Sequence, residues 1–150
     1  MEISMDIIKA LRDATGVSVM QCKKALEEAA GDLAKAEAVL REKAGIAASK
    51  KSDRTIGAGA VGTYVHDGVI GGMVLLGTET DFVAKNPEFA ALARELAMQV
   101  SAMAPENTEA LLESPYIKDG SKTVQDLLNE ATQKFGERVE LAQFARMSAR

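Results

Sequence analysis

Apolar residues in the first third of the chain recur at helical spacing in three short runs. The first run spans residues 7–11, and the apolar spacing breaks at Gly16. Ser18 and Asp32 then stand at helix-capping positions in front of the second and third runs. Three amphipathic helices in about forty-five residues make a bundle near the lower size limit for independent folding. We therefore predict a three-helix domain over residues 1–45.

The pattern then changes to that of strands. A polar stretch with alanines and lysines separates the two patterns, and we interpret it as a linker over residues 46–58, with a frayed helical start as an alternative for its first residues. Residues alternate in character from Val61 to His66, and Asp67-Gly68 follows, which is the strongest two-residue signal for a hairpin. Residues 69–76 are almost continuously apolar, as in a covered central strand. We expect two antiparallel strands joined by a tight turn.

Helical spacing returns in the last part of the chain. Asn86 stands at a capping position, and apolar residues continue at helical spacing to Met103. A second helix is predicted from about residue 124 to 135, and a final strand over residues 138–147. The alternation of this strand slips after Leu141, which indicates a β-bulge.

These elements together predict a protein of the α+β class. We expect its N-terminal three-helix bundle to resemble ubiquitin-associated (UBA-like) domains. The linker leads to a small antiparallel sheet packed with helices, which forms the core domain over residues 59–150. Because a sheet of few strands leaves its edges unpaired, we expect the final strand to pair with a second copy and the chain to form a homodimer through the sheet.

Charge and composition narrow the classes of partner. The chain has 150 residues, of which 22 are acidic and 18 are basic, so its net charge is -4. A protein that wraps nucleic acid needs basic residues to displace counterions from phosphates, so we expect no direct binding of nucleic acid. No apolar run is long enough to span a bilayer, and the first residues lack the layout of a signal peptide. We expect a cytoplasmic protein that binds another protein and no membrane.

No motif supports cofactor, metal or catalytic chemistry. The single cysteine, Cys22, has no partner for a disulfide or a zinc cluster, and we interpret it as a small core residue. Residues 57–62 match the spacing G-x-G-x-x-G, but these glycines precede a strand, whereas a dinucleotide site needs them after one. Glu79 and Asp81 have no third group near them in the sequence that would complete an acid–base site, so we do not interpret them as an acid pair. We predict no cofactor and no enzymatic activity.

Two segments carry a resemblance to a known family. Residues 11–26, Leu-Arg-Asp-Ala-Thr-Gly-Val-Ser-Val-Met-Gln-Cys-Lys-Lys-Ala-Leu, resemble the N-terminal signature of elongation factor Ts. Residues 80–85, Thr-Asp-Phe-Val-Ala-Lys, resemble the most diagnostic motif of the same family. The order and separation of the two motifs also match. The chain is shorter than the long members of the family and is similar to one of their two core subdomains.

The resemblance implies a guanine nucleotide exchange factor that binds elongation factor Tu in its GDP form and promotes the release of GDP. It implies that Asp81 and Phe82 intrude beside the Mg²⁺ and phosphate site of this partner, with Thr80 and Val83 as neighbours in the motif. It also implies that the surface around the first helix break docks on the nucleotide domain of the partner. The residues of that surface are Leu11, Arg12, Thr15, Gly16, Val19 and Met20.

Other interpretations of the same residues stay open at this point. Taken alone, Asp81 is typical of a turn and Phe82 of a core, and Val19 and Met20 fit the interior of the bundle as well as its surface. A second functional class is an adaptor, in which a UBA-like module that binds ribosomes or nascent chains is joined to a dimerising domain. The two motifs in register favour the exchange factor, because an adaptor has no need of residues 80–85.

Overall fold

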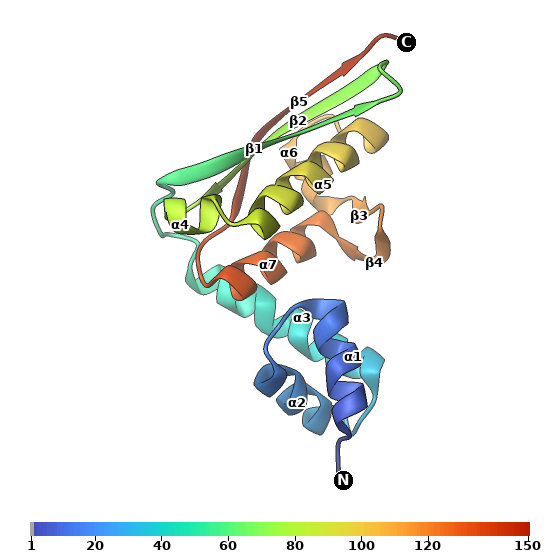
Figure 1. The fold of residues 1–150 in the computed structure, drawn as a ribbon, viewed down its shortest axis with the longest axis vertical. Coiled ribbons are helices and arrows are strands. Elements are labelled where there is room, and N and C mark those ends of the chain that lie inside the picture. The colour runs from blue at the N-terminus through green and yellow to red at the C-terminus, as the bar shows by residue number, and fades with distance from the viewer. Residues whose placement is uncertain (1) are drawn as a thin grey trace.

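Three helices whose first turns are capped by side chains build the N-terminal bundle at one end of the molecule (Figure 1). The computed structural model describes residues 2–150. The helices are α1 (Met5–Thr15), α2 (Val19–Glu28) and α3 (Leu33–Lys50). Backbone N–H groups in their first turns donate to the side chains of Ser4, Ser18 and Asp32, so the caps predicted at Ser18 and Asp32 are confirmed. The core of the bundle includes Ile8, Leu11, Cys22, Leu26 and Leu40.

The third helix extends beyond the predicted start of the linker. Residues 46–50, which the sequence assigns to a linker beginning at residue 46, form the end of α3. The alanines in this stretch favour a helix, and α3 also packs along α7 (Val124–Phe135). At this contact a Cβ on Gly45 would lie 3.9 Å from Nδ2 of Asn129. Tertiary packing thus prolongs the helix, and the connection to the sheet is limited to residues 51–57.

Three antiparallel strands form the main sheet in the order β1-β2-β5. Their bounds are β1 (Ala58–His66), β2 (Ile70–Thr78) and β5 (Glu140–Ser148), and the predicted turn at 67–68 lies between β1 and β2. Leu76 pairs with Leu141, whereas Leu75 pairs with Gln143, so Ala142 is an extra residue in β5. The β-bulge predicted after Leu141 is therefore confirmed.

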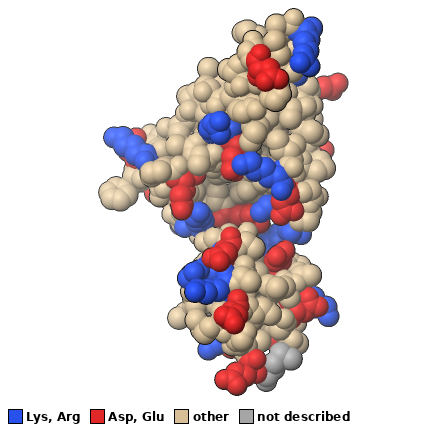
Figure 2. Space-filling view, turned by 45° about the vertical axis from the view of Figure 1, so that its right-hand side comes forward, with Lys and Arg blue, Asp and Glu red and all other residues tan. Residues whose placement is uncertain are grey.

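The molecule is elongated, with the bundle and the sheet at opposite ends (Figure 1). α3 and α7 pack against each other and join the two parts. Figure 2 shows acidic and basic side chains interspersed over the face in view, without an extended patch of one sign. Helices combined with an antiparallel sheet confirm the α+β class. Among residues 2–150, no helix is long and apolar enough to cross a membrane.

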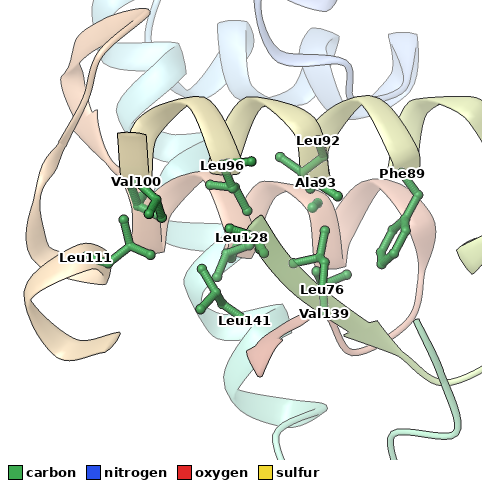
Figure 3. Packing of buried hydrophobic residues seen from close by; sticks show 14 residues of the cluster. Leu76, Phe89, Leu92, Ala93, Leu96, Val100, Leu111, Leu128, Val139 and Leu141 are labelled. Carbon is green, nitrogen blue, oxygen red and sulfur yellow. The ribbon is translucent and has the colours of Figure 1, made fainter. Parts of the chain in front are cut away.

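The core of the larger part lies between the sheet and two helices. α5 (Pro87–Met103) runs along β1 and β2, and α7 contributes to the same core. Figure 3 shows the apolar side chains that meet there, among them Leu76, Phe89, Leu92, Leu96, Leu128 and Leu141. A Cβ on Gly62 would lie 2.2 Å from the carbonyl of Ala93, and one on Gly72 would lie 2.4 Å from the carbonyl oxygen of Ala97. The two glycines therefore allow α5 to lie directly on the sheet.

Four short elements have no counterpart in the sequence-based expectations. They are α4 (Asp81–Ala84), α6 (Thr108–Glu113), β3 (Pro115–Tyr116) and β4 (Asp119–Thr123). β3 and β4 form a small hairpin that is fixed by Gln99, a fully buried residue of α5. Nε2 of Gln99 donates to the carbonyl of Pro115 at 2.8 Å, and its Oε1 accepts from the N–H of Ile117 at 2.9 Å. Such long-range hydrogen bonds leave no periodic trace in the sequence.

Candidate functional site

The motif at residues 80–83, called the tip below, projects from the core domain on one helical turn. Phe82 is 93% exposed, and Asp81 beside it is exposed as well. Val83 is half-buried against the core and Ala84 is buried, so the second half of α4 anchors the turn. The interpretation of Phe82 as a core residue is therefore wrong, and its ring is accessible to another molecule.

A carboxylate from a distant part of the chain holds the base of the tip. Glu137 follows the end of α7, and its Oε1 accepts from the hydroxyl of Thr78 at 3.1 Å and from the N–H of Thr80 at 2.9 Å. Its Oε2 accepts from the hydroxyl of Thr80 at 2.6 Å. We call these three residues the carboxylate brace. Partial removal from water by itself raises the pKa of the Glu137 carboxyl, but the hydrogen bonds from the two threonines outweigh this effect and lower the pKa below its ordinary value.

A second set of contacts joins the segment after α7 to the base of the tip. In this set the segment after α7 donates the hydrogen bond and a carboxylate next to the tip accepts it. The N–H of Arg138 donates to Oε2 of Glu79 at 2.7 Å. Nη1 of Arg138 donates to the carbonyl of Arg54 at 2.7 Å, and the guanidinium of Arg54 lies 3.6 Å from Oε1 of Glu79. The connection from the N-terminal bundle is therefore tied to the base of the tip.

The predicted docking surface on the bundle is exposed around the start of α2. Met20 is 68% exposed and Val19 is 38% exposed, so both side chains reach the surface. Gly16, which ends α1 with a φ of 76°, is exposed, and Arg12 is partly exposed with its guanidinium 3.7 Å from the carboxylate of Asp13. Two apolar side chains and one cation thus lie near the first helix break.

Two of the predicted contact residues support this surface from inside. Leu11 is fully buried in the bundle core, so its side chain packs against the other helices and does not reach the surface. Thr15 is half-buried, and its hydroxyl donates to the carbonyl of Leu11 at 2.8 Å and accepts from the N–H of Val17 at 3.4 Å. Both residues shape the helix break that positions Val19 and Met20.

The bundle and the tip meet the same end of α7. A Cβ on Gly16 would lie 3.6 Å from Nζ of Lys134, which is in the last turn of α7. The same Nζ pairs with the carboxylate of Glu88 at 2.8 Å, and Glu88 is in the first turn of α5, shortly after the tip. Glu137 follows Lys134 closely in the chain. The two predicted contact regions are therefore linked through the C-terminal end of α7.

The sequence alone did not identify Glu137 and Arg138, the two residues after α7 that hold the base of the tip. A glutamate directly after the glycine that ends a helix has the pattern of a solvated residue. Its partners Thr80 and Thr78 lie 57 and 59 residues earlier in the chain. No local signal connects these positions, and only the fold brings them together.

The arrangement is suited to contact with another macromolecule. It presents a carboxylate and an aromatic ring side by side on a turn that buried residues and hydrogen bonds hold in place. Within residues 2–150, the structure places no group of three or more His, Cys, Asp or Glu side chains where they could hold a metal ion. A ring of this kind is a common anchor in protein interfaces, where it fills an apolar pocket of the partner.

Comparison with known proteins places the chain in a family. The family model described as elongation factor TS matches residues 79–150. Elongation factor Ts of Desulforamulus reducens is 38% identical, over 97% of this chain and 88% of that protein. The proteins of the same name from Thermotoga maritima and Coprothermobacter proteolyticus are 39% and 35% identical, over 97% of this chain and 96% and 98% of their own lengths.

The alignments also show a difference in length. The alignment with the Desulforamulus protein runs over 191 positions, 41 more than the 150 residues of this chain, so that protein has segments without a counterpart here. Nearly all of this chain is nevertheless matched, from the helical bundle to the last strand. The chain belongs to the elongation factor Ts family.

Proposed function

We propose that this chain is a guanine nucleotide exchange factor that binds elongation factor Tu in its GDP form and promotes the release of GDP. The observation that carries the proposal is the exposed pair Asp81 and Phe82 on a turn anchored by Val83 and Ala84. Membership of the elongation factor Ts family supports the same partner. We expect the chain to act in the cytoplasm, where translation takes place.

The proposed mechanism loosens the contacts that retain GDP. A P-loop GTPase holds the nucleotide through backbone N–H groups, a lysine and a Mg²⁺ ion that bridges phosphate oxygens. The Phe82 ring inserts between packed side chains of the partner, and the Asp81 carboxylate brings negative charge near the metal site. Hydrogen bonds to charged groups contribute about 1.5–3 kcal/mol each, and about 1.4 kcal/mol corresponds to a tenfold change in rate. Loss of two or three such bonds therefore accelerates release by several orders of magnitude.

The bundle supplies a second contact. In this proposal Met20 and Val19 pack on the nucleotide domain of elongation factor Tu, with Arg12 and Gly16 beside them. Exposed apolar side chains together with an arginine have the composition of such an interface. Binding of this chain and binding of GDP are then linked in both directions, because a chain that lowers the affinity of the partner for GDP is itself bound less tightly when GDP is present. The proposed function involves no covalent chemistry and no cofactor of this chain.

Release of fluorescently labelled GDP from purified elongation factor Tu, with and without this chain, tests the proposal. Burial of a phenylalanine side chain contributes about 1.5–3 kcal/mol, so we expect Phe82→Ala to slow stimulated release about 10- to 100-fold. Because Phe82 is 93% exposed, the substitution should leave the melting temperature unchanged.

Ile117→Ala is the control, since Ile117 is an exposed apolar residue, 42% accessible, on the β3–β4 hairpin. We expect this variant to stimulate release like the wild type. If the wild-type chain does not accelerate release, the proposed function is wrong. If the wild-type chain accelerates release and Phe82→Ala does so at the same rate, the exchange activity stands but the role given to the ring does not.

We also propose that the chain forms a homodimer through its sheet. β5 is an edge strand, so its expected pairing with a second copy stays a prediction, and we propose contact through the outer face of the sheet as well. Most strand positions that point away from α5 bear no charge, and Glu140 at the start of β5 is the exception. The uncharged positions are Gly59, Val61, Thr63, Val65, Gly71, Met73, Leu75, Gly77, Gln143, Ala145 and Met147. Val65 and Met147 are 66% and 80% exposed, and the face has a depression of about 230 Å³ next to Met73. An exposed apolar face marks an interaction site, and in a twofold dimer the same face of each copy packs against that of the other.

Light scattering of the wild type and of Met73→Glu tests the dimer. A glutamate at the centre of the face introduces two unpaired carboxylates into the interface, so we expect a monomer. Met103→Glu is the matched control, because Met103 is exposed to a similar degree, 44% against 51%, at the end of α5. A wild-type chain that is monomeric at high micromolar concentration would contradict the proposal.

A further inference from the structure

The side chain of Thr80 makes an unusual choice of partner. Thr80 occupies the N-cap position of α4, where a threonine hydroxyl ordinarily accepts from a backbone N–H of the first turn. Here it makes no such hydrogen bond and instead donates to Oε2 of Glu137 at 2.6 Å. The hydroxyl thus anchors the tip to the segment after α7 and does not stabilise the short helix itself.

Glu137 receives three hydrogen bonds from the two residues that flank Glu79. The hydroxyl of Thr78 lies in the last position of β2, and the N–H and hydroxyl of Thr80 lie at the first position of the tip. Thr78 is fully buried, which fixes one side of the brace to the sheet. A single carboxylate therefore sets the direction in which the chain leaves the strand.

The backbone around Glu137 is held equally firmly. Gly136 ends α7 with a φ of 73°, and the N–H of Arg138 donates to Glu79 at 2.7 Å. Val139, which follows, is buried, and its N–H donates to the hydroxyl of Thr132 at 3.3 Å. The carboxylate of Glu137 is thus presented from a fixed backbone, which is what a positioning role requires.

We infer that Glu137 is a positioning residue for nucleotide exchange: through Thr78 and Thr80 it holds Asp81 and Phe82 in the orientation in which they reach the partner. The inference rests on the proposed function. A tip that turns freely must be ordered when the complex forms, whereas a braced tip is already in place. Loss of the brace therefore slows the maximal rate of GDP release more than it weakens docking, since the surface around Met20 is unaffected.

Stimulated release of labelled GDP, measured over a range of concentrations of the chain, separates these two effects. We expect Glu137→Ala to lower the maximal rate about tenfold or more, and to change the half-saturating concentration less than about threefold. Glu95→Gln is the matched control, because Glu95 is also a half-buried carboxylate that accepts from two side chains, Tyr116 and Lys118, but it lies away from the tip. Its maximal rate should equal that of the wild type.

Thr80 provides an independent test that does not depend on Glu137→Ala being folded. Thr80→Ser keeps the hydroxyl and should retain the rate, whereas Thr80→Val removes it without a change of shape and should lower the rate. If Thr80 acts through Glu137, the double variant Thr80→Val/Glu137→Ala is no slower than Glu137→Ala alone.

Three results would overturn the inference. The first is a Glu137→Ala variant that is folded by circular dichroism and has the maximal rate of the Glu95→Gln control. The second is an equal rate of release for the serine and valine variants of Thr80. The third is a double variant in which the two losses of rate add, since this indicates that Thr80 contacts the partner directly. The Phe82→Ala variant distinguishes this failure from failure of the proposed function. If Phe82→Ala is slow while Glu137→Ala is not, exchange through the tip stands and only the brace is rejected.

Discussion

A methyl group at Gly72 would be forced into the backbone of α5. An added Cβ would lie 2.4 Å from the carbonyl oxygen of Ala97 and 2.6 Å from Oγ of Ser101, whereas unstrained contacts between heavy atoms are about 3.5–4.0 Å. The helix must therefore move by about 1 Å, and overpacking of this kind costs about 1–3 kcal/mol. Because the obstacle is a backbone carbonyl, which no rotamer change can remove, we expect Gly72→Ala to fall at the upper end of that range.

Gly71, the preceding residue, is the matched control. It points to the outer face of the sheet, where the nearest heavy atom would lie 3.8 Å from an added Cβ. The change to alanine also reduces the entropy of the unfolded chain, which stabilises the native state by about 0.4–1 kcal/mol when the site has room. Gly71→Ala should therefore be neutral or slightly stabilising, and the two variants should differ by about 2–3 kcal/mol.

Urea unfolding followed by far-ultraviolet circular dichroism measures this difference, provided that the two variants share the same denaturant slope. For a chain of this size, about 2–4 °C of melting temperature corresponds to 1 kcal/mol, so the thermal midpoints should be separated by several degrees. If Gly72→Ala unfolds within about 0.5 kcal/mol of Gly71→Ala, α5 can withdraw from the sheet without loss. The close approach would then not be what selects glycine at this position.

Three further outcomes are expected. Met20→Ala should raise the concentration of the chain needed for half-maximal GDP release about tenfold while its melting temperature stays the same, because the side chain is 68% exposed; titration of stimulated release measures this. Burial raises the pKa of Glu95, but hydrogen bonds from Lys118 and Tyr116 outweigh it and lower the pKa below its ordinary value. The folded state then binds fewer protons than the unfolded state. The stabilisation by the ionised Glu95 carboxylate is therefore complete above about pH 4.3 and is lost as the pH falls through the lower pKa of the folded state. Urea unfolding between about pH 6 and pH 3 should show a weaker pH dependence of stability for Glu95→Gln than for the wild type. Ala104 ends α5 in the left-handed region with a φ of 47°, so Ala104→Gly should stabilise the fold by about 0.5–1 kcal/mol in the same unfolding experiment.

The features that could be predicted from the sequence depend on residues close together in the chain. Ser18 and Asp32 cap helices because their side chains reach backbone groups three residues later. The slip after Leu141 reveals the bulge because strand periodicity is a property of adjacent residues. The family motifs are local in the same sense, and they led to the tip at residues 80–83.

The features that could not be predicted depend on what covers a side chain. The sequence does not show whether an apolar residue is buried by its own fold or by another protein. The structure exposes Phe82 and buries Leu11 in the bundle. Glu137 was missed because its hydrogen-bond partners are far away in the chain. The end of α3 was placed too early because packing on α7, which no local pattern records, extends the helix.

The position of the Phe82 ring has a kinetic consequence. Because the ring already lies in water, no step inside this chain has to uncover it before an encounter with another protein is productive. Under the proposed function, uncovering the ring therefore adds no slow step, and the observed rate of the early phase of association should grow linearly with the concentration of this chain, without a lag. A lag in association would have to come from a step other than the exposure of this ring.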